Sequence, residues 1–585
     1  MKNNDEYQME SNCPDNLIGI NRKYPNYDFD TVLSGIGSIG KYQIFLVLAV
    51  YYITIPSAMN QVGSVFLSAI PDYRCYIQEV DNKLFVNQIN WNETVLDMST
   101  SFDSNTKKHD GCKQYSYRTN CTLPILEECF TNETSSCMNG HVFDKSGYES
   151  TTTTEWDLVC DRLYLTTLAS VAYFVGVFFG VILGGNLGDR FGRTRVLIIG
   201  QIFAFTFGVG CAFSPNLATF AATRFFIAIF CLSSGPPSFV YAIEIVGSEW
   251  RTFVGISMQI VFSIGYMILS GLSYKWRNWR HLQLSIAMFS AVYFIIWFFV
   301  PESPRWLLSR GQVKKAKKIS DKLAEKNGRK LSSDIWEKAV IDNENAVGNM
   351  YPYPFILLKR PHMRRVTINI VFCWFVVSLV YYGLSLNVGS LAGDDRVNNL
   401  LGGVCEIASC VIAILTMDRF GRRPIVSIGF LLGGISCILS TVCNYFSSDI
   451  KELGYVGLAL ALLGKLAVSG VFAVIYNFTA ELFPTALRAT AIGCGSMAAR
   501  LGSLMSPVII MIQYHVPWFT GAVFGIFSFI AGLTCLLLPE TNNVPLTTTL
   551  DEAEKFYSNA KKEIKRESST GEVLIANEYN MRMKH

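Results

Sequence analysis

Apolar residues in this chain come in long blocks separated by polar segments. Each block holds about 20 residues, the length that a helix needs to cross about 30 Å of hydrocarbon. The pattern therefore predicts an all-α polytopic membrane protein with twelve transmembrane helices. The predicted spans are 39–60, 163–187, 194–213, 217–240, 251–274, 282–300, 366–387, 397–417, 424–443, 455–478, 489–514 and 517–538.

Composition agrees with this prediction and excludes other classes of protein. Of the 585 residues, 50% are apolar and 16% are charged, whereas soluble domains carry about 25% charged residues. The net charge of +4 is small for this length, which argues against a nucleic-acid partner. The six histidines are scattered, and neither a metal cluster nor a nucleophile-and-base motif is recognisable. We therefore expect no enzyme, no cofactor and no metal site.

Two long polar segments orient the chain. Residues 301–365 contain 15 Lys and Arg against 7 Asp and Glu, whereas residues 67–160 contain 7 against 14. The positive-inside rule predicts that the basic segment is cytoplasmic and the acidic one extracellular, and an even number of spans then puts both tails in the cytoplasm. The predicted divisions are a tail at 1–38, a first half at 39–300 with its outer loop at 67–162, a middle loop at 301–365, a second half at 366–538 and a tail at 539–585.

The predicted outer loop contains cysteines and glycosylation acceptors. Six of the sixteen cysteines lie in it, and six cysteines in an extracellular segment indicate three disulfides, whose pairing the sequence leaves open. A zinc site is the less favoured alternative. Three Asn-X-Thr sequons are predicted to carry glycans. The cysteines are Cys75, Cys112, Cys121, Cys129, Cys137 and Cys160, and the acceptors are Asn92, Asn120 and Asn132.

The two halves repeat one another. Asp189-Arg190-Phe191-Gly192-Arg193 recurs at Asp418–Arg422, and Pro301-Glu302-Ser303 recurs as Pro539-Glu540-Thr541. Glu244 and Arg251 likewise recur as Glu481 and Arg488. Three features in the same order at nearly one offset predict two homologous six-helix halves. Such halves enclose a midplane site that opens alternately to each side of the membrane.

These runs carry a family resemblance. The segment 184–193 resembles the signature loop of the major facilitator superfamily. Within that superfamily, the cysteine-rich first loop and the segments 150–161, 301–308 and 479–485 resemble the organic cation, carnitine and organic anion transporter family. The resemblance covers about 40–540 and implies the major facilitator fold and a substrate that is a small organic ion.

Candidate substrate residues are polar or aromatic residues within the spans. Trp374 and Tyr381 are seven residues apart and share a helix face, where aromatic rings can attract an ammonium ion. Ordinary packing of aromatic rings is the alternative interpretation. Glu406 is an ionisable group at membrane depth, which marks it as a site candidate that could neutralise an ammonium group.

The resemblance adds further candidates. It implies that Tyr476 lines the cavity and that Gln259 matches a glutamine of the cation carriers. Lys465 and Arg500 match positions of the anion and carnitine branches, and at the position of Arg500 the well-known cation carriers have Asp. The chain departs from the cation carriers at 235–237, where Gly-Pro-Pro replaces a stacking Trp.

The repeated charged motifs are predicted to form the conformational switch. Arginines at helix ends bond carboxylates and carbonyls of neighbouring helices, and the resemblance implies a latch that breaks and reforms. Marking of topology by basic residues is the simpler alternative. The switch candidates are Asp189, Arg190, Arg193, Glu244, Arg251, Asp418, Arg419, Arg422, Glu481 and Arg488.

The resulting hypothesis is a plasma-membrane, alternating-access transporter of small organic ions. Organic cations similar to tetraethylammonium or zwitterions such as carnitine are the expected substrates, because Glu406 and Arg500 would handle opposite charges. If a protein carboxylate pairs with Arg500, the site is free for plain cations. The alternatives are an organic-anion exchanger and a non-transporting receptor on a carrier fold. The expected partners are the substrate and the lipid bilayer; the coupling ion is not predicted.

Overall fold

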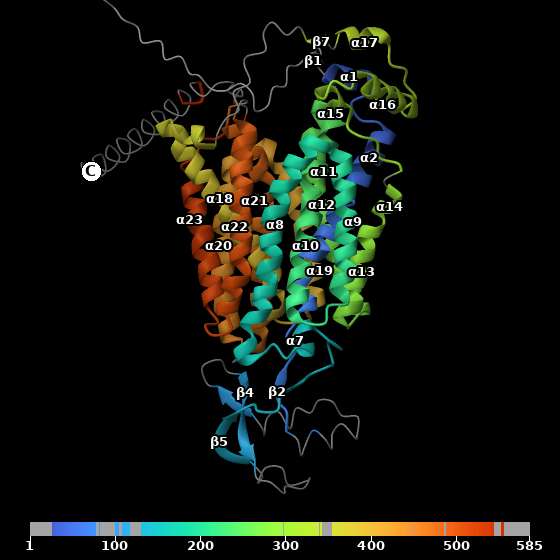
Figure 1. The fold of residues 1–585 in the computed structure, drawn as a ribbon. Helices are drawn as coiled ribbons and strands as arrows, with labels where there is room; N and C mark the ends of the chain where they lie inside the picture. Colours follow the sequence, from blue (N-terminus) through green and yellow to red (C-terminus); the bar gives the residue numbers. More distant parts are fainter. Residues whose placement is uncertain are drawn as a thin grey trace, which may run out of the picture.

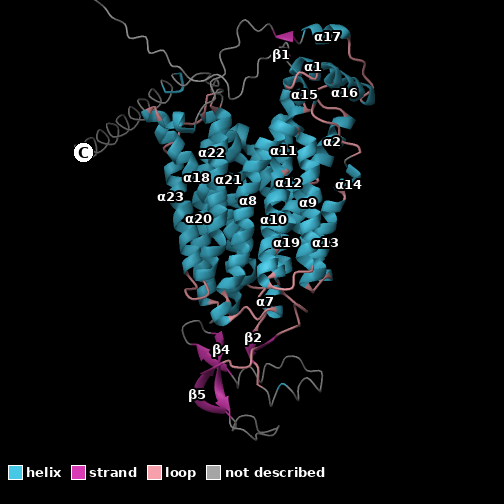
Figure 2. Cartoon of the chain, viewed as in Figure 1, coloured by secondary structure: helices cyan, strands magenta, loops and turns pink. Residues whose placement is uncertain are grey.

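A computed structural model describes residues 26–27, 29–77, 81, 100–103, 108–117, 130–296, 298–338, 340–341, 354–447, 450–484, 487–542 and 552–554. The chain forms a bundle of long helices (Figure 1). Short strands project from one end, called here the strand-bearing end, and short helices α15–α17 lie at the opposite end (Figure 2).

The first half of the chain contributes one set of helices to the bundle. Helices α3 and α4 follow α2 almost without a break, and α10 continues into α11 at Ser234, next to Pro236 and Pro237. The short α7 and α14 flank this set. Its bounds are α2 (Lys41–Tyr51), α3 (Thr54–Val62), α4 (Ser64–Leu67), α7 (Thr152–Glu155), α8 (Tyr164–Phe191), α9 (Arg193–Ala212), α10 (Leu217–Ser233), α11 (Gly235–Glu244), α12 (Arg251–Lys275), α13 (Trp279–Ala291) and α14 (Tyr293–Ile296).

The second half contributes six long helices, and shorter helices connect the halves. The six are α18 (Pro361–Leu386), α19 (Asp395–Phe420), α20 (Arg422–Phe446), α21 (Lys451–Leu482), α22 (Arg488–Ile512) and α23 (Phe519–Cys535). Outside the bundle are α1 (Phe29–Ile36), α15 (Pro304–Ser309), α16 (Val313–Lys326) and α17 (Ser333–Lys338).

Within the described residues, ten helical segments are long and apolar enough to span a membrane. With α13–α14 and α23 they make up the twelve predicted spans. Most helices run past the predicted ends, and α18 begins at Pro361 rather than at 366. Proline suits the first turn of a helix, because its missing N–H would have no partner there.

The strands are short and lie outside the bundle. Strand β4 (Lys108–Tyr117) pairs antiparallel with β3 (Thr100–Asp103) and β5 (Phe130–Ser136), and β2 (Tyr73–Cys75) pairs with β6 (His141–Phe143). At the opposite end β1 (Asn26–Tyr27) pairs with β7 (Val340–Ile341).

Two disulfides cross-link the strand-bearing segment, and one of them ties it to the start of the bundle. They join Cys75 to Cys137 and Cys112 to Cys160, the last of which lies just before α8. Cys121, Cys129, Asn92 and Asn120 lie outside the described residues, and Asn132 lies in β5.

Candidate functional site

The predicted substrate residues converge from several helices of the second half. Trp374 and Tyr381 lie on α18, Glu406 on α19, Lys465 and Tyr476 on α21, and Arg500 on α22; Gln259 lies on α12 of the first half. Because these helices pack side by side, residues far apart in the sequence share one region at mid-bundle.

Glu406 lies at the centre of this region with no solvent exposure. Its carboxylate accepts hydrogen bonds from Tyr381 Oη at 2.7 Å and from Ser263 Oγ at 2.9 Å. Lys465 Nζ lies 3.2 Å from Glu406 Oε1. A buried carboxylate needs a counter-charge and hydrogen-bond donors, and Glu406 obtains both from the protein itself.

The ammonium group of Lys465, like the carboxylate of Glu406, has both a counter-charge and hydrogen-bond partners. Besides the carboxylate, its ammonium group donates to Tyr266 Oη at 2.8 Å and to Ser385 Oγ at 2.9 Å. An ammonium group has three donors, so each donor has a partner. Lys465 Nζ also lies 4.1 Å from the centroid of the Tyr266 ring. The buried pair is therefore electrically neutral and fully hydrogen-bonded.

An aromatic cluster adjoins the ion pair. The rings of Trp374 and Tyr476 meet edge to face with centroids 4.4 Å apart, and those of Tyr381 and Phe472 lie 5.4 Å apart. Trp374 Nε1 donates to Thr479 Oγ1 at 2.9 Å. Trp374 and Tyr381 are almost fully buried, so in this conformation the rings pack against one another.

Arg500 differs from Lys465 because no described carboxylate pairs with it. It is half-buried, and its Nε atom is buried without a hydrogen-bond partner. The nearby tyrosines Tyr382, Tyr476 and Tyr173 interact with it electrostatically. Its positive charge is therefore uncompensated within the described structure.

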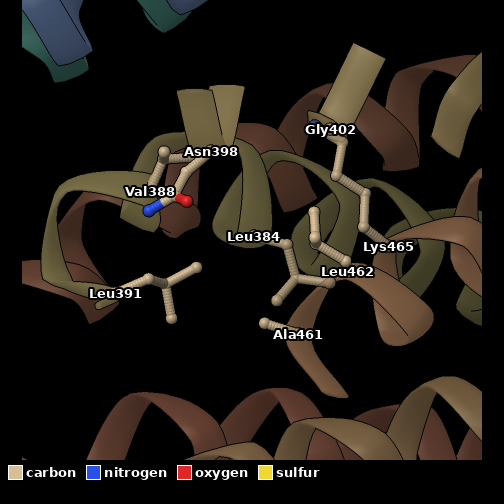
Figure 3. A pocket seen from close by; sticks show the side chains of 8 residues that line it. All are labelled: Leu384, Val388, Leu391, Asn398, Gly402, Ala461, Leu462 and Lys465. Carbon is tan, nitrogen blue, oxygen red and sulfur yellow. The ribbon is translucent and has the colours of Figure 1, made fainter. Parts of the chain in front are cut away.

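Gln259 lies on α12, one helical turn before Ser263, which donates to Glu406. It is half-buried, and its backbone carbonyl accepts from Ser263 Oγ at 3.0 Å. It is thus linked to Glu406 only through Ser263. A small pocket beside Lys465, lined also by Leu384 and Gly402, has room for about one water molecule (Figure 3).

The predicted switch residues of the first half form a network at the end opposite the strands. Arg193 binds Asp189 Oδ1 at 2.6 Å and Glu244 Oε1 at 3.2 Å. Glu302 Oε1 accepts from the backbone N–H of Arg193 at 2.9 Å and thereby caps α9. Gly192 links α8 and α9 at a φ of 109°, and a Cβ there would lie 2.3 Å from the Glu302 carboxylate, so glycine is needed.

The second half repeats this network. Arg422 binds Asp418 Oδ1 at 3.0 Å and Glu481 Oε2 at 3.1 Å, and Glu540 Oε1 accepts from its backbone N–H at 3.0 Å. Each network stays within its own half. The repeated motifs therefore fasten helices inside each half in this conformation.

The other switch candidates lie outside these two networks. Arg251 pairs with Asp30 of α1 and not with Glu244. Arg488 has two buried nitrogen atoms without hydrogen-bond partners in the described structure. Arg190 and Arg419 are exposed.

Polar contacts between the halves run from mid-bundle to the strand-bearing end. The hydroxyls of Ser263 and Tyr266, in the first half, contact the ion pair of the second half. In addition, Asn399 Nδ2 donates to Ser270 Oγ at 2.6 Å, and Tyr382 Oη donates to Gln61 Oε1 at 2.6 Å. Between described residues, no hydrogen bond or ion pair joins the halves at the opposite end. The molecule is therefore closed at the strand-bearing end.

Two arginines, Arg277 and Arg396, bind one carbonyl at this end and are called here the arginine clasp. The carbonyl of Gly147 accepts from Arg277 Nε of the first half at 3.0 Å and from Arg396 of the second half at 2.6 Å. The Arg396 guanidinium also lies 5.0 Å from the Tyr148 ring centroid and 5.2 Å from that of Tyr274.

Sequence reasoning missed the contacts that α12 makes to the ion pair. Ser263, Tyr266 and Ser270 occur at i, i+3 and i+7, so they form a polar stripe on one face of an otherwise apolar helix. That periodicity was the available signal. No group of three or more His, Cys, Asp or Glu residues able to hold a metal lies in the described parts of the chain.

Comparison with known proteins identifies the family. The family model "Sugar (and other) transporter" matches residues 114–551. The chain is 32% identical to an organic cation transporter protein of Drosophila melanogaster over 93% of this chain and 98% of the relative. The chain belongs to the organic cation, carnitine and organic anion transporter family of the major facilitator superfamily.

Two human relatives have similar identities. Solute carrier family 22 member 13 is 33% identical, covering 90% of this chain and 93% of the relative, and organic cation/carnitine transporter 2 is 30% identical, covering 90% and 94%. The inward-open structure of the Escherichia coli xylose transporter XylE covers 88% of the carrier and 99% of its own chain, with a TM-score of 0.56 and 18% identity. This likeness confirms the major facilitator fold. Membership of the family makes the carrier a multi-pass membrane transporter.

Proposed function

We propose that this carrier transports small organic ions that bear a carboxylate, with zwitterions such as carnitine as the preferred class. The observation behind the proposal is the distribution of charge at mid-bundle. Lys465 neutralises Glu406, whereas Arg500 has no carboxylate partner among the described residues. A net positive site favours a substrate with a negative group, because an unpaired buried charge is costly.

The aromatic cluster would bind the cationic end of a zwitterion. Tyr476 interacts electrostatically with Arg500, and the Trp374 ring meets the Tyr476 ring edge to face. Faces of such rings attract a quaternary ammonium group with about 0.5–2 kcal/mol each. In this proposal Gln259 contributes a polar side chain from the first half.

An organic-anion exchanger is the second candidate, and the uncompensated Arg500 favours it. Plain organic cations remain expected substrates of the family, and in this conformation Lys465 occupies the carboxylate that would neutralise them. One human relative is named organic cation/carnitine transporter 2, so its name refers both to organic cations and to carnitine, a zwitterion. We assign no catalytic reaction to the carrier.

We further propose that the carrier lies in the plasma membrane with the strand-bearing end outside and both termini in the cytoplasm. Two disulfides at that end favour an oxidising compartment. The acidic first loop, its sequons and the basic middle loop favour the same orientation. The charged networks around Arg193 and Arg422 would then be the cytoplasmic part of the switch.

Uptake of labelled carnitine, benzoate and tetraethylammonium by cells that express the chain tests the proposal. We expect saturable carnitine uptake, its loss in Arg500→Asp, and partial retention in the matched control Arg500→Lys. Surface biotinylation corrects for expression. Voltage-driven tetraethylammonium uptake that exceeds carnitine uptake and survives Arg500→Asp would refute the proposal. Ligand binding without flux would indicate a receptor instead.

A further inference from the structure

A second arginine, Arg224 on α10, is buried without a counter-charge. It lies seven residues from the strand-bearing start of the helix, a distance of about 10 Å, and only 2% of its surface is exposed. Tyr173 and Cys211 are the titratable groups that interact with it. Neither is ionised at neutral pH at its ordinary pKa, and no described carboxylate pairs with Arg224.

The other fully buried cations of the described structure each pair with a carboxylate. Arg74 binds Asp81 through both of its terminal nitrogens, at 3.0 and 2.5 Å, and Lys465 binds Glu406. A buried charge is normally kept only where a counter-charge compensates it. The exception at Arg224 therefore points to a counter-charge that arrives from outside the protein.

Unpartnered polar atoms surround this guanidinium. Arg224 donates one hydrogen bond, to the backbone carbonyl of Asn60 at 2.9 Å, and its carbon Cζ lies 4.3 Å from the centroid of the Tyr173 ring. Arg224 Nη1, Tyr173 Oη and Asn60 Oδ1 are buried without hydrogen-bond partners. The first two are donors. Three helices of the first half thus present an incomplete binding shell that suits an acceptor with negative charge.

A residue of the second half covers this shell. Tyr382 donates to Gln61, and its ring meets the Phe174 ring edge to face with centroids 5.4 Å apart. Gln61 and Phe174 directly follow Asn60 and Tyr173 in the chain. When the halves separate at the strand-bearing end, Tyr382 must leave both contacts, and the shell opens on that side.

We propose that Arg224 is the outward-facing anion-binding residue of the carrier, which receives the substrate carboxylate before Arg500 does. This inference rests on the proposed function. Arg500 lies in the middle of α22, twelve residues from either end, so it is deeper than Arg224. The Tyr173 ring packs on Arg224, and Tyr173 also interacts electrostatically with Arg500. The carboxylate passes from one guanidinium to the next as the outer side closes.

The test compares the two faces of the membrane. The KM of carnitine is measured in right-side-out and inside-out vesicles for the wild type, Arg224→Gln, Arg224→Lys and Tyr173→Phe. We expect Arg224→Gln to raise the outer KM about tenfold or more, as expected for loss of a charged hydrogen bond, with little change at the inner face. Arg224→Lys should lie between, and the KM of tetraethylammonium should not rise.

Tyr173→Phe keeps the ring on Arg224 and removes one donor, so it serves if Arg224→Gln does not fold. We expect it to raise the outer KM of carnitine about two- to tenfold. Equal KM increases at both faces, or loss of maximal rate alone, would assign Arg224 a structural role and overturn the inference. Arg500→Lys, which is expected to retain part of the uptake, should raise both KM values. Absence of saturable carnitine and benzoate transport in the wild type would overturn the proposed function and this inference together.

Discussion

Replacement of Lys465 by methionine removes half of the buried ion pair while it keeps an unbranched side chain of similar length. Glu406 then retains only the hydroxyls of Tyr381 and Ser263, at 2.7 and 2.9 Å. The carboxylate must stay charged without a counter-ion, take up a proton, or bind a cation from solution. Each of these outcomes can be measured.

The structure sets the size of the effect. At the ammonium–carboxylate distance of 3.2 Å, two unit charges attract by about 5 kcal/mol at an effective dielectric constant of about 20. Removal of one partner of a buried pair costs about 3–5 kcal/mol. The double variant Lys465→Met with Glu406→Gln leaves no buried charge, and exchange of a whole pair is often nearly neutral.

The free energy of unfolding is measured by SDS titration of the purified carrier in dodecyl maltoside micelles. We expect each single variant to lose about 3–5 kcal/mol and the double variant to recover most of that loss. Lys465→Met should also gain tetraethylammonium uptake, because Glu406 becomes free to neutralise a cation. A loss under about 1 kcal/mol in Lys465→Met, or additive losses in the double variant, would refute the reasoning.

Three further predictions concern the strand-bearing end. Arg396→Gln removes the clasp on the Gly147 carbonyl, so a cysteine introduced by Gln61→Cys should react faster with an impermeant maleimide; an unchanged rate would count against the clasp. Cys75→Ser opens a link across 62 residues, worth about 4 kcal/mol of loop entropy. It should lower the amount of carrier at the cell surface, and adding Cys137→Ser should lower it no further. Asn132→Gln should remove one glycan, seen as a smaller mass shift on glycosidase treatment; an identical shift contradicts the sequon prediction.

The spans could be predicted closely because the thickness of the bilayer limits an apolar block from both sides. The ends were less accurate, since helices continue beyond the apolar part. Helix α21 begins at Lys451 and ends at Leu482, whereas the apolar block covers 455–478. The apolar pattern predicted one continuous span over 217–240, so it did not show the break between α10 and α11 beside Pro236.

Ionisable residues within the spans stood out in the sequence, but their partners did not. Glu406 and Lys465 were both candidates, whereas their pairing depends on how α19 and α21 pack. Arg251 was predicted to be a switch residue, but its partner Asp30 on α1 could not be identified from the sequence. Sequence periodicity shows which face a residue occupies on its own helix, and it does not show which helix covers that face.

Under the proposed function, the tethered ammonium of Lys465 would make the carrier discriminate against plain cations. It occupies the carboxylate of Glu406 with all three donors engaged, much as a substrate ammonium would. A group on a short tether competes at an effective concentration in the millimolar range or above, so a free cation that binds only at micromolar to millimolar concentrations gains little by displacing it. In the proposed function a zwitterion would not need Glu406, because Arg500 and the aromatic rings would bind its two ends. We therefore predict that the residue at 465 decides whether the carboxylate at 406 binds the substrate or a side chain of the protein.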